Sequence, residues 1–300
     1  MSKVMTMKEA ISKYVKSGNI LFLSGAQHGE PAAAIHEIIR QKIDHISLVC
    51  CLVTTSSLLI GEGLIDRMIT GYAQQDEERS YAIAKAKAMN KLPVFEEYSH
   101  FGLSMALMAG QMGVPFMPTR CMIGSDIPKY NENIKTIKCS FTGVNVAIVK
   151  AIVPDVGIIH VQRADAEGNA QKWGSLGMDV EGINASKTVI VTTEKIVNSE
   201  IIRQDPNRTI IPGFRVSAVV KQPWGAHPMH LGGCYDGDQF GFMMEVRGRE
   251  GYEAYMEKLV YGVSDWEEYL KIRRETKGDE YFERFEIKNP VMSEPIISGY

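Results

Sequence analysis

Residues 19–40 read NILFLSGAQHGEPAAAIHEIIR and contain a short apolar run, a glycine turn and an amphipathic stretch. The run over residues 19–23 stops at Ser24-Gly25, which predicts a buried strand followed by a tight turn. Pro31 can occupy the first turn of a helix, where its missing N–H costs nothing, and the isoleucines behind it recur at helical spacing up to Gln41. The stretch therefore predicts one unit of strand, glycine turn and helix.

Similar apolar runs return along the chain. They lie at residues 46–53, 144–149, 156–161, 188–193 and 216–220. A strand that is apolar throughout is typical of a parallel sheet whose two faces are both covered by helices. Helical stretches at 77–90 and 101–110 are interleaved with these runs. We therefore expect an α/β fold with an open, mostly parallel sheet covered by helices.

The two ends of the chain carry their own signals. Thr6 and Glu9 have the spacing of a capping box, which predicts a helix directly after Thr6. Residues 121–142 are polar and irregular, and we expect them to run over the surface. The stretch 252–284 is charged, with apolar residues spaced as on amphipathic helices. We expect a main α/β domain over residues 1–250 and a C-terminal helical extension over 251–300 that packs on the core or on a partner.

The composition excludes several classes of protein. The chain has 300 residues, of which 45% are hydrophobic and 23% charged, enough to bury a sizeable core. Its net charge is -3 without long blocks of one sign, so nucleic acid is not an expected partner. No apolar run approaches the ~18 to 20 residues that span a bilayer, and no secretory signal is recognisable, so we expect a cytoplasmic protein without a membrane partner. The five cysteines form no CxxC pair and are expected to be reduced thiols.

The first candidate site is the turn Ser24-Gly25-Ala26, which directly follows the predicted strand. Backbone N–H groups in such a turn can face an anion or a developing oxyanion. The alternative is an ordinary glycine turn without a ligand. His28 and Glu30 belong to the same turn, and neither has a partner nearby in the sequence.

A second candidate site lies where residues 96–100 lead from a strand into a helix. Ionisable and polar groups arrive together there, ending in Ser99 and His100. The alternative is that Glu96 and its neighbour cap or solvate the coming helix, with Ser99 as its N-cap. Arg120 then emerges from an apolar loop and could hold a carboxylate.

The remaining motifs give weaker evidence of function. Residues 225–238 collect two histidines, a cysteine and two aspartates, but their spacing matches no compact metal site, so no metal is expected. Residues 165–169 read as a hairpin turn. Common nucleotide-binding, hydrolase and metalloprotease motifs are absent. These patterns alone leave an α/β enzyme or a ligand-binding domain.

Several stretches, in order, together resemble one known family. They are MSKVMTMKEAISKYVKSGN at 1–19, EPAAAIHEIIRQ at 30–41, EEYSHFG at 96–102, AGQMGVPFMPTR at 109–120, IIHVQRADAEGN at 158–169, EKIVNSEIIRQDP at 194–206, IPGFRVSAVV at 211–220 and PWGAHP at 223–228. They are similar to the A (alpha) subunits of glutaconate CoA-transferase and its relatives, the class I CoA-transferases, over residues 1–238. The resemblance implies an open α/β fold of the NagB/RpiA-like type. It also implies a complex with a B (beta) subunit, usually an α2β2 heterotetramer.

The reaction that the resemblance implies is transfer of coenzyme A from an acyl-CoA to a carboxylic acid. The coenzyme A thioester is then a substrate, and no permanently bound cofactor is expected. The family's nucleophile is a glutamate in a Ser-Glu-Asn-Gly motif of the B subunit. This chain has no such motif: its Ser-Glu pairs begin at Ser199 and Ser293 and continue with Ile and Pro. No catalytic nucleophile is therefore expected in this chain.

The resemblance also implies roles for the candidate residues. Ser99 and Arg120 would bind the acyl or acceptor carboxylate, and His100 would support them. Gly25 would shape the turn between Ser24 and Ala26. The family usually has Gly-Gly-Phe at those three positions, so Ala26 leaves room for an acyl group bulkier than glutaconyl.

Two other functions remain open beside transfer. Relatives include hydrolases that open a ring in steroid degradation and a decarboxylase acting on a CoA thioester. The ring-opening hydrolases carry a glutamate near the position of Ser99, whereas transferases keep serine, which favours transfer here. The other alternative is a non-catalytic ligand-binding module.

Overall fold

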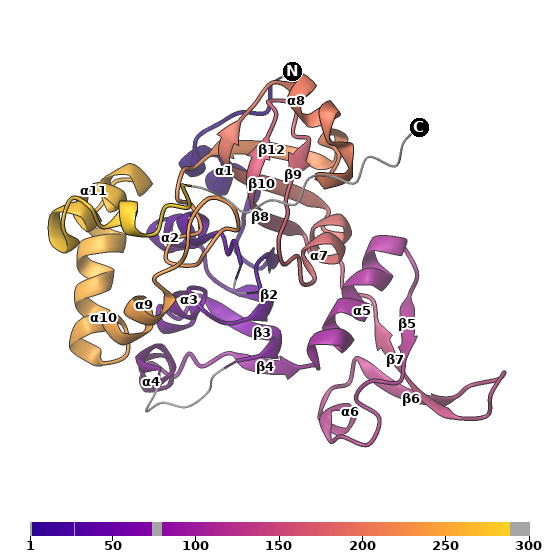
Figure 1. Ribbon diagram of the computed structural model, residues 1–300. Helices are drawn as coiled ribbons and strands as arrows, with labels where there is room; N and C mark the ends of the chain where they lie inside the picture. The colour runs from indigo at the N-terminus through magenta and orange to yellow at the C-terminus, as the bar shows by residue number, and fades with distance from the viewer. Residues whose placement is uncertain (1, 27, 74–79, 289–300) are drawn as a thin grey trace.

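A nine-stranded sheet forms the centre of the chain in the computed structural model, which describes residues 2–26, 28–73 and 80–288 (Figure 1). Its strands are β1 (Ile20–Leu23), β2 (Ile46–Leu52), β3 (Ile65–Tyr72), β4 (Val94–Glu97), β8 (Val156–Ala164), β9 (Ala170–Gln171), β10 (Thr188–Ile196), β11 (Thr209–Ile211) and β12 (Val216–Lys221). The parallel part runs β12-β10-β8-β1-β2-β3-β4. The antiparallel pairs described in this sheet are those of β9 with β8 and with β11. The predicted open, mostly parallel α/β sheet is confirmed.

Helices cover both faces of the main sheet. One face carries α1 (Met7–Tyr14), α2 (Ala32–Arg40), α3 (Ser57–Gly61), α4 (Tyr81–Ala88), α9 (Gln239–Glu245), α10 (Arg249–Tyr255), the π-helical segment η3 (Met256–Tyr261) and α11 (Trp266–Lys277). The other face carries α5 (His100–Met112) and α7 (Asp179–Ala185), and α8 (Ser199–Gln204) lies near the end of β10. Along β1, Leu21 and Leu23 belong to the first core and Phe22 to the second. Burial on both faces explains why these strands are apolar throughout.

The predicted capping box at Thr6 and the predicted strand and helix around residues 19–40 are all present. Thr6 accepts a hydrogen bond from the Glu9 N–H, and the Glu9 carboxylate accepts one from the Thr6 N–H, which completes the capping box of α1. Pro31 lies at the N-cap of α2. The predicted helix over 77–90 corresponds to α4, and residues 77–79 of that prediction lie outside the described residues.

A second, three-stranded antiparallel sheet lies to one side of the main sheet, beyond α5 (Figure 1). It consists of β5 (Phe116–Thr119), β7 (Asn145–Lys150) and β6 (Ile134–Lys138), with α6 (Ile127–Tyr130) beside it. The prediction that residues 144–149 join the main parallel sheet is wrong. The reason is that β7 buries only one face, with Ala147 and Val149 inward, and an apolar run alone does not reveal this. The stretch 121–142 is largely exposed as predicted, but it is more regular than expected because it supplies α6 and β6.

The C-terminal helices pack on the chain's own core. The His36 ring of α2 lies 5.1 Å from the ring of Trp266 and 5.3 Å from that of Tyr269, both in α11. Residues 289–300 of the proposed C-terminal extension lie outside the described residues. Within the described part of the chain, no helix has the length and apolar character needed to cross a membrane.

Candidate active site

The candidate residues follow the carboxyl ends of parallel strands, which meet along one edge of the sheet. Ser24 follows β1, Thr54 follows β2, and Ser99 follows β4. In open α/β sheets, ligands bind outside this edge. The fold therefore places the two candidate sites on the side of the sheet where a ligand is expected.

The backbone of the Ser24-Gly25-Ala26 turn is held by its own chain. The Ser24 N–H donates to the Ile158 carbonyl at 3.0 Å, and the Gly25 N–H donates to Asp179 Oδ1 at 2.8 Å. Both N–H groups are therefore occupied, and the oxyanion role considered for this turn cannot fall on either of them. Gly25 has φ +101°, and a Cβ there would lie 2.7 Å from the Glu30 nitrogen. Only glycine fits this position.

A buried ion pair fixes the glycine turn from behind. Lys172 Nζ lies 2.5 Å from Asp179 Oδ2 and 3.2 Å from the His28 carbonyl oxygen. The side chains of Lys172 and Asp179 are 0% and 2% exposed. Asp179 thus holds the Gly25 end of the turn while Lys172 holds the His28 end. The sequence did not predict this pair, because the two residues stand far from the turn in the sequence and no local pattern marks them.

Glu30 connects the turn after β1 to the turn after β2. Its buried carboxylate accepts hydrogen bonds from the Thr54 hydroxyl, from the Thr55 N–H at 2.9 Å and from the Ser56 N–H at 3.1 Å. These donors open the short helix α3. Among the buried hydroxyl oxygens in these two turns that have no hydrogen-bond partner among the described residues are Ser24 Oγ and Thr55 Oγ1.

His28 is buried and neutral. Desolvation by burial, with a smaller contribution from the Lys172 charge, lowers the pKa of His28 to about 3. Its Nε2 accepts the Gly232 N–H at 2.9 Å, which joins the loop 225–238 to the turn. The partners of His28 and Glu30 are thus supplied by distant parts of the chain.

The second candidate group lies at the start of α5. Ser99 is the N-cap of this helix, with the Gly102 N–H donating to Ser99 Oγ at 3.0 Å. This confirms the capping interpretation of Ser99. Cys121 Sγ lies 3.5 Å from Ser99 Oγ, so the loop after β5 reaches the same place. The residue that precedes Cys121, Arg120, is exposed.

The neighbours of Ser99 have separate roles. His100 is exposed and lies on Gly71 of β3, where a Cβ would come within 2.1 Å of its ring. Glu96 does not cap α5: its carboxylate accepts from Tyr98 Oη at 2.7 Å and from Asn133 Nδ2 at 2.9 Å. That part of the helix-capping alternative is wrong.

The structure keeps the two candidate groups apart. Strands β2 and β3 separate β1 from β4. With about 4.8 Å between neighbouring strands, the Ser24 turn and the Ser99 end lie about 14 Å apart across the sheet. A ligand that contacts both must be extended along the carboxyl edge.

Comparison with known proteins identifies the family. Residues 4–222 match the model of the coenzyme A transferase family. The chain belongs to the coenzyme A transferase family. The match covers the main sheet from β1 to β12 and the small sheet, and it ends before the loop 225–238 and the C-terminal helices.

Relatives within the family are A subunits. The A subunit of 3-oxoadipate CoA-transferase from Pseudomonas knackmussii is 35% identical, over 90% of this chain and 97% of its own length. The A subunit of glutaconate CoA-transferase from Acidaminococcus fermentans is 34% identical, over 90% of this chain and 91% of its own length. The crystal structure of glutaconate CoA-transferase from that organism superposes with a TM-score of 0.82 at 32% identity, covering 95% of this chain and 96% of the other. These matches confirm the resemblance to class I CoA-transferases, and this chain is a CoA-transferase chain of the alpha type.

A further relative is longer than this chain. An Archaeoglobus fulgidus protein of undetermined function is 36% identical over 95% of this chain, which spans 65% of the length of that relative.

The loop 225–238 follows the region matched to the family model. Its side chains contact the C-terminal part of the chain. His227 is buried, with Nδ1 2.8 Å from Tyr269 Oη and Nε2 3.1 Å from Tyr281 Oη. In residues 2–26, 28–73 and 80–288, no group of three or more His, Cys, Asp or Glu side chains is arranged to hold a metal ion. His227 thus joins the loop to the C-terminal helices.

Proposed function

We propose that this chain is the A (alpha) subunit of a heteromeric acyl-CoA:carboxylate CoA-transferase, working with a B (beta) subunit in an α2β2 complex. The coenzyme A thioester is its substrate, and the nucleophilic glutamate comes from the B subunit. The observation that carries this assignment is the combination of an alpha-type fold with glutamates at the carboxyl edge that are already occupied. Glu30 has three donors, and Glu194 has three as well, from His160, Tyr235 and the Trp224 N–H.

A nucleophilic carboxylate needs an oxygen that can reach the substrate. In the proposed reaction, the partner's glutamate attacks the thioester carbonyl, forms an acyl anhydride and releases the coenzyme A thiolate. The thiolate then attacks the glutamyl carbonyl, which gives a glutamyl-CoA thioester and frees the first carboxylate. The acceptor carboxylate repeats these steps in reverse order and leaves as its CoA thioester. Because Glu30 and Glu194 are held by their own chain, neither is suited to this attack.

The proposed contribution of this chain is the wall of the site. Ser99 Oγ accepts the N-cap bond, and its hydroxyl hydrogen donates to Cys121 Sγ at 3.5 Å, so a ligand oxygen would compete only with this long bond to sulfur. Arg120 is exposed and precedes Cys121, which contacts Ser99, and it can pair with a carboxylate of the acyl group or of the acceptor. His100 supports this end of the site, and Ser24, Gly25 and Ala26 shape the other end.

The test is to co-express this chain with a B-type partner and to follow acyl exchange between an acyl-CoA and acetate by mass spectrometry. Hydroxylamine or borohydride trapping of the glutamyl thioester locates the nucleophile. Exchange and trapping that need both chains, with the label on the B subunit, support the proposal. A complex that releases free coenzyme A without exchange indicates a hydrolase, and a label on this chain contradicts the assignment of the nucleophile.

A further inference from the structure

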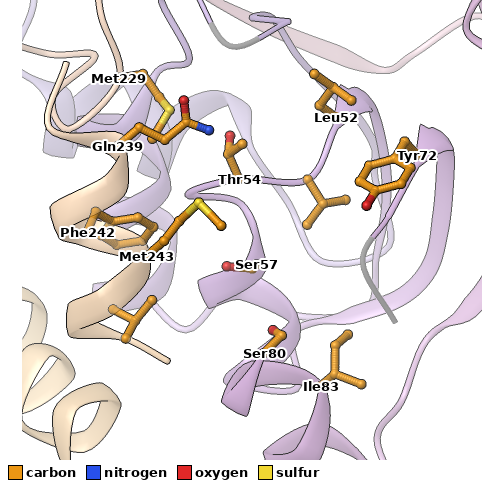
Figure 2. Close-up of a pocket in the computed structure, with 12 residues that line it drawn as sticks. Leu52, Thr54, Ser57, Tyr72, Ser80, Ile83, Met229, Gln239, Phe242 and Met243 are labelled. Atoms are coloured by element: carbon orange, nitrogen blue, oxygen red, sulfur yellow. The ribbon is translucent and has the colours of Figure 1, made fainter. Parts of the chain in front are cut away.

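An apolar cavity of about 250 Å³ opens at the carboxyl edge between the ends of β2 and β3 and the helix α9. Figure 2 shows side chains from these elements converging on it, among them Leu52, Tyr72, Phe242 and Met243, together with Ile83 of α4. Its polar groups are uncharged, and none of the described residues that line it carries a charge. The chemistry of the site described above assigns no role to this cavity.

The cavity borders the turn after β2 and the end of β3, and each of these contacts one of the candidate groups. Thr54 lines it and also donates its hydroxyl hydrogen to the Glu30 carboxylate, which connects it to the turn after β1. Tyr72 lines it from the end of β3, and the preceding residue, Gly71, carries His100 on the opposite face of the sheet. Successive residues of a strand point to opposite faces. The cavity and the His100 ring therefore lie at the last two residues of β3, on opposite faces of the sheet.

Size and charge limit what the cavity can hold. Sites for complete drug-sized ligands measure about 300 to 1,000 Å³, so a smaller cavity suits part of a ligand, not a whole CoA thioester. None of the described lining residues would offer a cation to a carboxylate buried inside, and burying an unpaired charge is strongly unfavourable. A neutral hydrocarbon group would instead exchange contact with water for contact with apolar side chains.

The mouth of the cavity can adapt to its contents. Met243 is 48% exposed and Tyr72 57% exposed, so both stand at the boundary with solvent. Methionine is unbranched and polarisable, and it adjusts to ligands of different shape. A hydrocarbon chain entering between them would leave its thioester at the mouth, beside the carboxyl edge.

We propose that this cavity binds the uncharged hydrocarbon part of the acyl group, so that the acyl donor is the CoA thioester of an apolar monocarboxylic acid. This inference deepens the proposed transferase function and rests on it. It assigns different groups to the two substrates, because Arg120 then binds the second, non-reacting carboxylate of a dicarboxylate acceptor and the cavity binds the hydrocarbon chain of the donor.

Binding without turnover tests the cavity. The complex with the B subunit is titrated calorimetrically with S-hexyl-CoA and S-ethyl-CoA, thioethers that cannot react. We expect S-hexyl-CoA to bind at least tenfold more tightly. Met243→Trp, which fills the cavity, should remove this preference. Met244→Trp, on the next residue of α9, similarly exposed but outside the lining, should retain it. Val246→Phe, another lining residue, replaces Met243→Trp if that variant does not assemble, with the same expected loss.

The possible outcomes are distinct. Equal binding of the two thioethers by the unsubstituted complex overturns the inference, and so does an equal response of the Met243 and Met244 variants. A tenfold preference that only the cavity-filling variant removes supports it. If that preference is found while no acyl exchange occurs with any donor, the cavity assignment stands and the transferase proposal fails.

Discussion

Replacing Lys172 by methionine should destabilise the chain strongly, although the residue is invisible from outside. Lys172 and Asp179 are 2.5 Å apart and almost fully buried, and between them they bind both ends of the glycine turn. Lys172→Met keeps most of the side-chain volume but leaves the Asp179 carboxylate buried without its cation. Breaking a buried pair in this way costs about 3 to 5 kcal/mol.

The size of the effect can be expressed as a melting temperature. Unfolding entropy is about 2.1 cal/mol/K per residue, or about 0.6 kcal/mol/K for a chain of this length. A loss of about 3 to 5 kcal/mol therefore lowers Tm by about 5 to 8 °C. Thermal unfolding followed by circular dichroism, on the chain alone and in its complex, measures this shift.

The matched control is Lys187→Met. Lys187 Nζ also lies close to a carboxylate, 2.8 Å from Asp155 Oδ1, but its side chain is 64% exposed. Exposed pairs contribute about 0 to 1 kcal/mol, so this variant should lose less than about 2 °C. Adding Asp179→Asn to Lys172→Met should recover part of the loss, because the unpaired buried charge is removed while an oxygen remains for the Gly25 N–H. The reasoning is refuted if Lys172→Met melts within about 2 °C of the unsubstituted chain, or if the double variant is less stable than the single one.

Three further changes test the site. Arg120→Ala should raise KM for a dicarboxylate acceptor about tenfold or more, as expected for a lost charge-assisted hydrogen bond, and should change KM for a monocarboxylate far less. Steady-state kinetics measure both values, with Arg249→Ala as an exposed control. Equal effects on the two acceptors refute the pairing of Arg120 with a carboxylate. Gly25→Ala should lower the free energy of unfolding, measured in urea titrations, at least twice as much as Gly18→Ala does. Both glycines have positive φ, but only the new Cβ at position 25 meets backbone atoms. Equal losses would contradict the steric argument. Ala26→Phe should lower transfer from the preferred acyl donor, and an unchanged donor profile in the exchange assay would show that this side chain does not limit the acyl group.

The sequence predicted the strands that are apolar throughout and missed β3, whose apolar residues are interrupted. Strand β1 was recognisable because three of its four residues are fully buried on the two sides of the sheet. Strand β3, with Asp66 and Arg67 near its start, has no continuous apolar run, although it pairs with both β2 and β4. Strand β7 has such a run but belongs to the small sheet. A continuous run of apolar residues therefore indicates that a strand is buried, but it does not indicate which strand it pairs with.

In the candidate site, the features set by neighbouring residues could be predicted from the sequence, and those set by distant residues could not. Ser99 as an N-cap and Gly25 in a strained turn follow from their immediate neighbours, and both could be predicted. The ion pair of Lys172 with Asp179 could not, because its function is to hold a turn about 150 residues earlier, where Asp179 Oδ1 accepts the Gly25 N–H. Nor could the apolar cavity, because its wall is assembled from strand ends and a helix that only the fold brings together.

The polar groups at the carboxyl edge explain why this chain would need a partner for its chemistry. Glu30 and Glu194 are each held by donors of the same chain. His28, with its pKa lowered to about 3, stays neutral throughout the physiological range and keeps its Nε2 as an acceptor for the Gly232 N–H. The two glutamates are therefore committed to shaping the site and are not free to attack a thioester, and His28 does not carry a proton between about pH 5 and 8. A rigid turn on one side and an adaptable apolar mouth on the other can position an acyl-CoA, and under the proposed function the reactive carboxylate must then be delivered by the B subunit.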